Sequence, residues 1–183
     1  MPWGISNEYR FVFIHIPKTA GCAINAFLKN YMHVGSNHAT ISEAEAWHKA
    51  RQIEIPWEMF QPFAVVRNPY DRFALSYFYK RGQRVHRKVS ESEIFRLLEN
   101  GNQALRTQVS WINDRVRLLK FENLTNDLNE FLNEVEIPLY AEDMPIVHKV
   151  VAEEKFDDHF APGDKEIIRN VYKEDFKLWE NLR

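Results

Sequence analysis

The chain has 183 residues, which is the usual size of one domain (residues 1–183) and enough to bury a core without disulfides. Its 24 basic and 26 acidic side chains give a net charge of −2, so any anionic ligand must be bound by a local cluster of donors. The only cysteine, Cys22, excludes an intramolecular disulfide and a multi-cysteine zinc site. No apolar run is long enough to span a bilayer and no signal peptide is recognisable, so we expect a cytoplasmic protein.

The first predicted elements are a strand and two helices. Residues 11–16 (FVFIHI) form a short apolar run of aromatic and branched side chains, which is typical of a buried strand. Apolar positions then follow a helical stripe over residues 22–32. Ser42 with Glu45 has the spacing of a capping box and predicts the start of a second helix.

The remaining chain continues this alternation. A buried strand is predicted at residues 63–66, and Pro69 then stands where a helix would begin. A further strand is predicted at residues 115–121, which alternate weakly. Three more helices are predicted: one capped by Ser90 with Glu93 and ending at Gly101, one over residues 124–135, and one over residues 165–182 capped by Asp164.

Strands that alternate with helices predict an α/β fold with three layers, α/β/α, and a mostly parallel central sheet. In such sheets ligands bind at the carboxyl ends of the strands, beside the start of the following helices. Two distinctive segments, residues 15–22 and 66–77, each lead out of a predicted strand. We therefore expect both segments to contribute to one ligand site.

The segment at residues 15–22 (HIPKTAGC) has the composition of an anion-binding loop. Backbone N–H groups at the start of a helix point outward, Gly21 permits close approach of a ligand, and Lys18 supplies a mobile charge. The glycine spacing differs from that of nucleotide triphosphatase loops and of dinucleotide-binding loops. The alternative interpretation is an ordinary strand–turn–helix corner with a solvated lysine.

The segment at residues 66–77 (VRNPYDRFALSY) offers a second anion site. Arg67 ends the predicted strand and has a planar fork suited to a phosphate. Ser76 lies about two helical turns into the next helix, where its hydroxyl would reach the same phosphate. Asp71 and Arg72 are interpreted as structural, pairing and capping around the turn. An Arg–Asp surface pair on an amphipathic helix is the alternative.

Together these two segments closely resemble the cofactor-binding motifs of sulfotransferases that use 3′-phosphoadenosine 5′-phosphosulfate (PAPS). The likeness is greatest to the carbohydrate sulfotransferases of the heparan 2-O- and chondroitin types and to their small bacterial relatives. Weaker likeness continues at Gln108, at Trp111, and over residues 120–124 and 144–148. The resemblance implies a P-loop-like sulfotransferase fold and an enzyme that moves a sulfuryl group from PAPS to an acceptor hydroxyl on a glycan, without a metal. The slightly acidic net charge and the lack of a long apolar run lead us to expect neither a nucleic-acid partner nor a membrane span.

Carried over by position, the resemblance assigns Arg67 and Ser76 to the 3′-phosphate. It assigns the 5′-phosphosulfate to the loop, at Lys18, Thr19, Ala20, Gly21, Cys22 and Ala23. The family usually has Thr-Ser where this chain has Cys22 and Ala23, so two hydroxyl donors are missing while the backbone N–H groups remain. A hydrogen bond to a charged group contributes roughly 1.5–3 kcal/mol, so weaker binding is expected, and a protein that binds PAPS without turnover stays an alternative.

For the chemistry, Lys18 is expected to neutralise the charge that develops on the leaving oxygen. A base must accept the acceptor's proton, and histidine is the natural choice. His38 lies between the two motifs, in the interval where related carbohydrate sulfotransferases have their base. The alternative for His38 is a loop histidine that bonds the next helix start, and other candidate bases are Glu43, His33 and His148. His15 is interpreted as a residue of the core or of the layer beneath the site.

Two further functions remain open at the level of sequence. A nucleotide-dependent phosphotransferase would use the same anion loops, although the usual triphosphate loop is missing. A nucleic-acid-binding module would use the basic stretch at residues 80–88, against the slightly acidic net charge. The same stretch would alternatively receive an anionic acceptor or form a solvated helix end.

Overall fold

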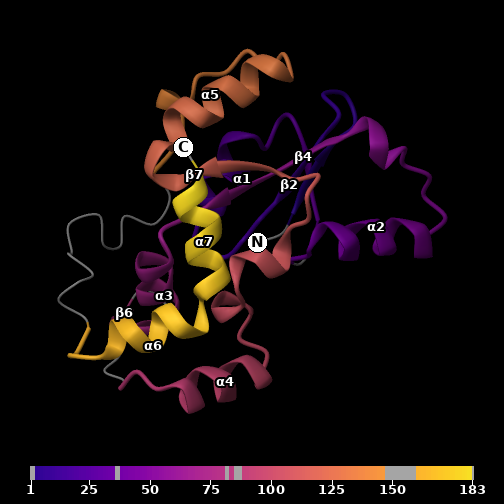
Figure 1. The fold of residues 1–183 in the computed structure, drawn as a ribbon. Helices are drawn as coiled ribbons and strands as arrows, with labels where there is room; N and C mark the ends of the chain where they lie inside the picture. The colour runs from indigo at the N-terminus through magenta and orange to yellow at the C-terminus, as the bar shows by residue number, and fades with distance from the viewer. Residues whose placement is uncertain (1–2, 36–37, 81–82, 85–87, 147–159, 183) are drawn as a thin grey trace.

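A computed structural model describes residues 3–35, 38–80, 83–84, 88–146 and 160–182 (Figure 1). Its centre is a five-stranded sheet with the strand order β3-β1-β2-β4-β7. These strands are β1 (Gly4–Ser6), β2 (Phe11–Ile14), β3 (His33–Val34), β4 (Gln61–Val66) and β7 (Arg117–Lys120). A separate two-stranded pair consists of β5 (Tyr79–Lys80) and β6 (Gln83–Arg84).

Strand direction places the ends of three strands on one edge of the sheet. Strand β2 pairs in parallel with β4, and β4 pairs in parallel with β7. Strand β1 runs antiparallel to both β2 and β3, so four of the five strands share one direction. The mostly parallel α/β sheet is confirmed, and β1 and β3 are strands that the sequence analysis did not predict.

Seven α-helices stand in the described ranges. They are α1 (Gly21–Phe27), α2 (Ile41–Ala50), α3 (Pro69–Tyr77), α4 (Glu91–Glu99), α5 (Leu124–Glu134), α6 (Asp164–Val171) and α7 (Lys173–Asn181). Short 3-10 turns include η1 (Trp57–Met59), η3 (Gln108–Trp111) and η4 (Phe121–Asn123). None of the helices in these ranges has the length and apolar character needed to cross a membrane.

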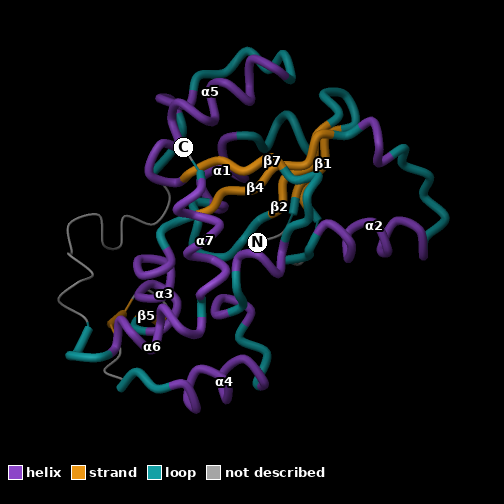
Figure 2. The backbone as a smooth tube through the Cα atoms, viewed as in Figure 1, coloured by secondary structure: helices purple, strands orange, loops and turns teal. Residues whose placement is uncertain are grey.

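Helices cover both faces of the sheet, as the alternation of strand side chains requires (Figure 2). Phe11, Phe13 and Phe63 face α1 and α5 in one buried cluster. Val12 and Ile14 point the other way and pack with α2 and η3. A third cluster joins α3, α4, α6 and α7, which gather toward the carboxyl ends of β4 and β7 (Figure 1). This third cluster therefore supports the edge where the two motifs emerge.

Two predicted helix starts need comparison with the observed caps. Helix α3 begins at Pro69, as predicted. Helix α2 is capped by Thr40 with Glu43, whereas the predicted pair of Ser42 with Glu45 was wrong. The Thr40 hydroxyl accepts from the Glu43 N–H at 3.1 Å, and the Glu43 carboxylate accepts from the Thr40 N–H at 2.7 Å. Both pairs have the same spacing, so sequence alone did not separate them.

The ends of other helices also differ from the prediction. Helix α1 stops at Phe27, because the chain must turn before residue 32 to enter β3. The helix predicted over residues 165–182 is two helices, α6 and α7, with a break at Tyr172. Asp164 is the first residue of α6 and not its cap, and its carboxylate accepts from the N–H of Ala161 at 2.7 Å. The predicted cap at Ser90 is confirmed, since its hydroxyl accepts from Glu93 N–H.

Candidate functional site

The loop between β2 and α1 is held in an unusual backbone conformation. Lys18 and Ala20 have φ angles of 70° and 68°, although neither is a glycine. Non-glycine residues adopt positive φ rarely, and such strain concentrates at binding sites. Thr19 between them is buried, and its hydroxyl donates to the Ile16 carbonyl at 2.8 Å. The Thr19 side chain therefore stabilises the loop from within and does not face outward.

This conformation leaves a row of backbone donors open. Within the described ranges, none of the N–H groups of residues 18–22 donates a hydrogen bond. The N–H groups of Ala23 and Ile24 both donate to the Ala20 carbonyl, at 2.9 and 3.2 Å. The sequence analysis expected the backbone N–H groups of both Cys22 and Ala23 to remain available to a ligand. In the structure the Cys22 N–H is unbonded, whereas the Ala23 N–H already donates to Ala20. Successive unbonded N–H groups beside residues with positive φ can form a concave anion site, and the exposed Lys18 adds positive charge beside it.

Gly21 is required at this loop by close packing. A Cβ added there would lie 1.9 Å from Cδ2 of His15, which is far shorter than any real contact. The His15 ring is buried and stacks on Phe13 with centroids 5.8 Å apart. The expected role of His15 beneath the site is therefore supported, because its imidazole fixes the path of the loop.

His38 lies next to His15 although 23 positions separate them in the chain. The two rings have centroids 4.4 Å apart, and His38 Nδ1 is 2.9 Å from the His15 carbonyl oxygen. A carbonyl oxygen can only accept, so Nδ1 carries the hydrogen and the neutral ring presents an unprotonated Nε2. Burial lowers the pKa of His38 from its ordinary value, partly opposed by the bond to His15. A neutral imidazole with a free Nε2 is the form that accepts a proton.

The other candidate bases are placed less suitably. The Glu43 carboxylate already completes the cap of α2, and it lies 4.0 Å from Arg106. His33 is exposed on β3, the strand at the far edge of the sheet. His148 lies outside the described residues, as do five positions of the basic stretch at residues 80–88 and the last two residues of the landmark at 144–148.

Arg67 follows β4, at the same edge of the sheet as the loop. Gln108 holds its backbone from both sides: the Arg67 N–H donates to Gln108 Oε1 at 3.0 Å, and Gln108 Nε2 donates to the Arg67 carbonyl at 2.9 Å. The guanidinium lies over the Phe121 ring at 4.0 Å. Burial lowers the pKa of Arg67, while Asp71 and Glu122 oppose the shift. The residue is thus a partly desolvated cation in a defined position, suited to a phosphate.

Ser76 makes a different contact from the predicted one. Its hydroxyl donates to the carbonyl of Arg72 at 2.8 Å, one turn back in α3. Donation to a phosphate would require the hydroxyl to rotate away from that carbonyl. In the structure the Ser76 hydroxyl is therefore bonded within its own helix.

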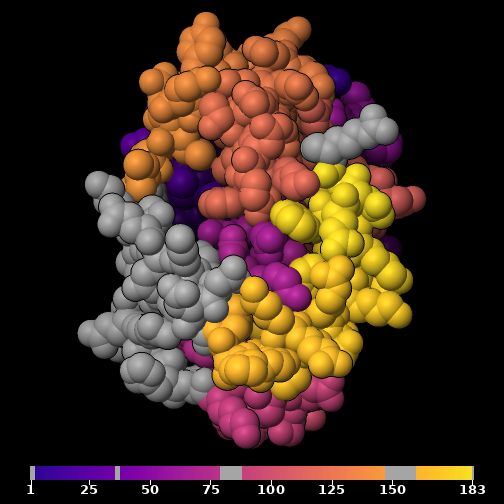
Figure 3. All heavy atoms as spheres, turned by 60° about the vertical axis from the view of Figure 1, so that its left-hand side comes forward, coloured from indigo at the N-terminus to yellow at the C-terminus, as the bar shows by residue number. Residues whose placement is uncertain are grey.

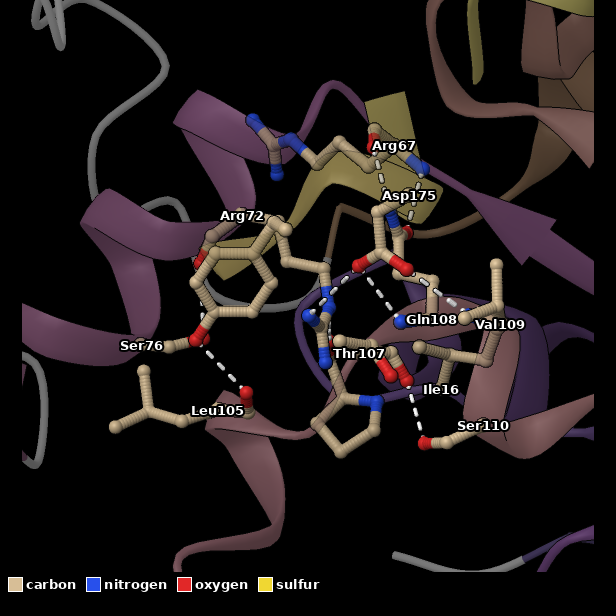
Figure 4. A network of polar contacts seen from close by, with 12 residues as sticks. Ile16, Arg67, Arg72, Ser76, Leu105, Thr107, Gln108, Val109, Ser110 and Asp175 are labelled. Carbon is tan, nitrogen blue, oxygen red and sulfur yellow. Dashed lines mark hydrogen bonds and ion pairs between the residues drawn. The ribbon is translucent and has the colours of Figure 1, made fainter. Parts of the chain in front are cut away.

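Arg72 is structural, as predicted, but its partners were not foreseen. Its side chain is buried, Nε donates to the Pro17 carbonyl at 3.0 Å, and Nη1 lies 4.0 Å from Asp175 (Figure 4). The helix cap is Asn68, whose side chain accepts from the Tyr70 N–H. Arg72 therefore connects the second motif to the first one and to α7.

Sequence reasoning missed Asp175. The signal that was available is its position on α7, because Ile168, Tyr172 and Asp175 follow the spacing of a buried helical stripe. A carboxylate on such a stripe is rarely buried without partners. The sequence indicated Gln108 only through a weak family likeness, whereas the structure shows that its side chain makes two hydrogen bonds to the backbone of Arg67.

Elsewhere the described residues contain an open hollow of about 1050 Å³ between α2 and η1. Its lining includes Lys49, Trp57 and Arg115 and no residue of either anion-binding segment. Within the described ranges, no three His, Cys, Asp or Glu side chains gather to hold a metal ion. The hollow is therefore separate from the two anion-binding segments.

Known proteins were compared with the whole chain. Searches among curated proteins and among solved structures gave no match. A family model described as the sulfotransferase family matches residues 3–162. This match contains all five strands of the sheet and both anion-binding segments, and it ends before α6. The chain belongs to the sulfotransferase family.

Proposed function

We propose that this protein transfers a sulfuryl group from PAPS to a hydroxyl group of a carbohydrate. The observation that carries the proposal is the row of open N–H groups at residues 18–22. It lies after β2, and Arg67 lies after the neighbouring parallel strand β4. Two anion sites at adjacent strand ends suit a ligand with two separate anionic groups, which is the character of PAPS.

The proposed contacts divide the ligand between the two sites. The N–H groups of residues 18–22, with the Lys18 ammonium, would hold the 5′-phosphosulfate. Arg67 would hold the 3′-phosphate, with Ser76 joining after its hydroxyl rotates. Ala23 would contribute packing only, because its N–H is bonded to Ala20. When bound, PAPS supplies the sulfuryl group and a leaving oxygen that gains negative charge.

The residues of this chain would then perform two tasks. The Lys18 ammonium would neutralise the negative charge on the leaving oxygen, as cations do in phosphoryl transfer. His38 Nε2 would accept the proton of the attacking hydroxyl. The Nδ1 bond to His15 would keep the ring oriented and in the required tautomer. No metal is part of this proposal.

Support for a carbohydrate acceptor comes from the likeness of HIPKTAG and VRNPYDRFALSY to the carbohydrate sulfotransferases. One observation favours a second candidate, a protein that binds PAPS without turnover. Position 23 offers neither a hydroxyl nor a free N–H, because Ala23 donates to Ala20. Binding in that case would persist through the remaining donors while the transition state would be stabilised less.

The test is incubation of the purified protein with PAPS and a panel of glycan, lipid and phenol acceptors, followed by mass spectrometry. A sulfated glycan and an equal amount of 3′-phosphoadenosine 5′-phosphate (PAP) are expected. The variant Lys18→Ala serves as the inactive control. PAP binding without any sulfated product would favour the second candidate. Phosphorylated products in a parallel incubation with ATP in place of PAPS would contradict both candidates.

A further inference from the structure

The carboxylate of Asp175 is completely buried where α7 meets η3. Its Oδ2 accepts from the N–H of Gln108 at 2.7 Å, and its Oδ1 accepts from the N–H of Val109 at 3.0 Å. Arg72 Nη1 lies 4.0 Å from Oδ2. Burial raises the pKa of Asp175, whereas these hydrogen bonds and the charge of Arg72 oppose the rise.

Two branches lead from this carboxylate to the two anion sites (Figure 4). Through Gln108 it reaches the backbone N–H and carbonyl of Arg67. Through Arg72 it reaches the carbonyl of Pro17, the residue directly before Lys18. Figure 4 shows Asp175 between them, with the guanidinium of Arg67 extending away from it. Asp175 thus connects both sites without facing the ligand.

Stability alone is a poor explanation for this arrangement. Moving a charged side chain out of water costs several kcal/mol, and a well-packed apolar pair is often as stable as a buried ion pair. A buried network with defined partners instead restricts where its members can lie. Here the members are the two segments that carry the anion sites.

We propose that Asp175 is a positioning residue that sets the separation between the loop and Arg67, and thereby the preference for nucleotides that carry both a 5′ anionic group and a 3′-phosphate. This inference rests on the proposed function. The residue lies on α7, outside the stretch matched by the family model, so the match assigns it no role.

The test measures the affinity of the full chain for PAP and for adenosine 5′-monophosphate (AMP), which lacks the 3′-phosphate. In Asp175→Asn the side chain keeps its size, but its NH₂ group faces one of the two backbone N–H donors and can accept no hydrogen bond from it. The substitution also removes the negative charge near Arg72. Affinity for PAP is expected to fall about tenfold, while affinity for AMP changes by less than about twofold. The ratio of the two affinities is therefore the decisive quantity.

That ratio separates positioning from mere structural support, because partial unfolding lowers both affinities equally. The matched control is Asp164→Asn, which removes another buried carboxylate that accepts a backbone N–H but has no bond to either anion site. Its ratio should equal that of the wild type. If Asp175→Asn fails to fold, Gln108→Met tests the branch to Arg67 with the same two ligands.

Each outcome bears on one proposal. A wild-type protein that binds neither nucleotide would contradict the proposed function. A wild type that prefers PAP, together with a folded Asp175→Asn that keeps this preference, would overturn the positioning role alone. An equal loss of both affinities, or the same change of ratio in Asp164→Asn, would overturn it as well.

Discussion

The proton on His38 Nδ1 is directed at the carbonyl of His15, which leaves Nε2 for the acceptor. The ratio kcat/KM should therefore rise with pH through an apparent pKa below 6.5, because burial lowers the pKa of His38. Replacing His38 by Ala should lower the rate by roughly 10²–10⁴-fold and remove this limb of the profile. Initial rates over a pH series would measure both effects.

The control for this variant is His33→Ala, since His33 is exposed on β3. It should keep the rate and the pH profile of the wild type. PAP affinity should be unchanged in both variants, because the proposed base would face the acceptor and not the nucleotide. A His38→Ala protein with a normal rate and profile would show that the base is another group.

His38 also affects folding. Its pKa in the folded protein lies below its value in the unfolded chain, so the free energy of unfolding falls as the pH decreases through the interval between these two pKa values.

Alanine variants of Lys18 and Arg67 should distinguish stabilisation of the transition state from binding of the ground state. The charge on the leaving oxygen develops during transfer, so Lys18→Ala should lower kcat by roughly 10²–10³-fold and weaken PAP binding much less. The 3′-phosphate does not change charge, so Arg67→Ala should mainly weaken PAP binding, by roughly 10–100-fold. Steady-state kinetics with titration calorimetry of PAP would measure both.

A matched control for the lysine is Lys18→Arg, which keeps the charge at the same strained backbone position. It should retain more activity than Lys18→Ala. Near-normal turnover of Lys18→Ala at saturating PAPS would mean that the loop only binds. Equal effects of the two alanine variants on kcat would contradict the division of roles.

At the scale of elements, the cap of α2 gives a direct test. Thr40 stands two residues after His38, and its hydroxyl accepts from the Glu43 N–H. Thr40→Ala should lower the free energy of unfolding by about 1 kcal/mol, the usual contribution of such a cap. Ser42→Ala, at the exposed second residue of the helix, should change it by less than about 0.5 kcal/mol. Urea unfolding measures both changes. If Ser42 were the cap, Ser42→Ala would lower the free energy of unfolding more than Thr40→Ala.

Local signals predicted the elements with strong local chemistry. Pro69 marked the start of α3, Ser90 marked the cap of α4, and the apolar run of β4 was recognised. The strands β1 and β3 were missed, because three and two residues are too few for a recognisable alternation, and β3 forms by pairing with β1, which is distant in the chain. The break at Tyr172 carries neither glycine nor proline, so it gave no signal.

The same limit applies to the site. Strand order and motif order predicted that Lys18 and Arg67 lie near one edge of the sheet, because parallel strands end together. His38 was chosen from its interval between the two motifs and from the family resemblance, and its contact with His15 was not predicted. The bond between Gln108 and Asp175 joins residues 67 positions apart, and such a contact has no local pattern. The Ser76 hydroxyl was assigned to a ligand because spacing cannot show its competing bond to Arg72.

At the scale of the whole molecule, ligand binding should be visible as stability. PAP at a hundredfold excess over its dissociation constant should raise the free energy of unfolding by roughly 2.7 kcal/mol. For a chain of this length the melting temperature would rise by roughly 5–10 °C. Adenosine 5′-phosphosulfate, which lacks the 3′-phosphate, should protect less at the same concentration. Equal protection by the two ligands in thermal melts would contradict the role assigned to Arg67.

The second anion-binding segment lies next to parts of the chain that are distant from it in sequence. Figure 3 shows atoms of the purple segment, where β4 leads into α3, at the surface between the orange region that contains α5 and the yellow α7. The third core cluster lies beneath and contains residues of α3, α6 and α7. A ligand at this segment would therefore stabilise contacts between the middle and the end of the chain.

The contact between Gly21 and His15 has a consequence for engineering this loop. Any larger residue at position 21 meets the imidazole, so a library that varies position 21 alone would return glycine. The bond to His38 uses the backbone carbonyl of His15, which every amino acid supplies. A library that varies positions 15 and 21 together would therefore recover pairs with a small residue at 15 and a larger one at 21. In such pairs His38 would keep its hydrogen bond to the backbone of residue 15, while the side chains packed beneath the loop would change.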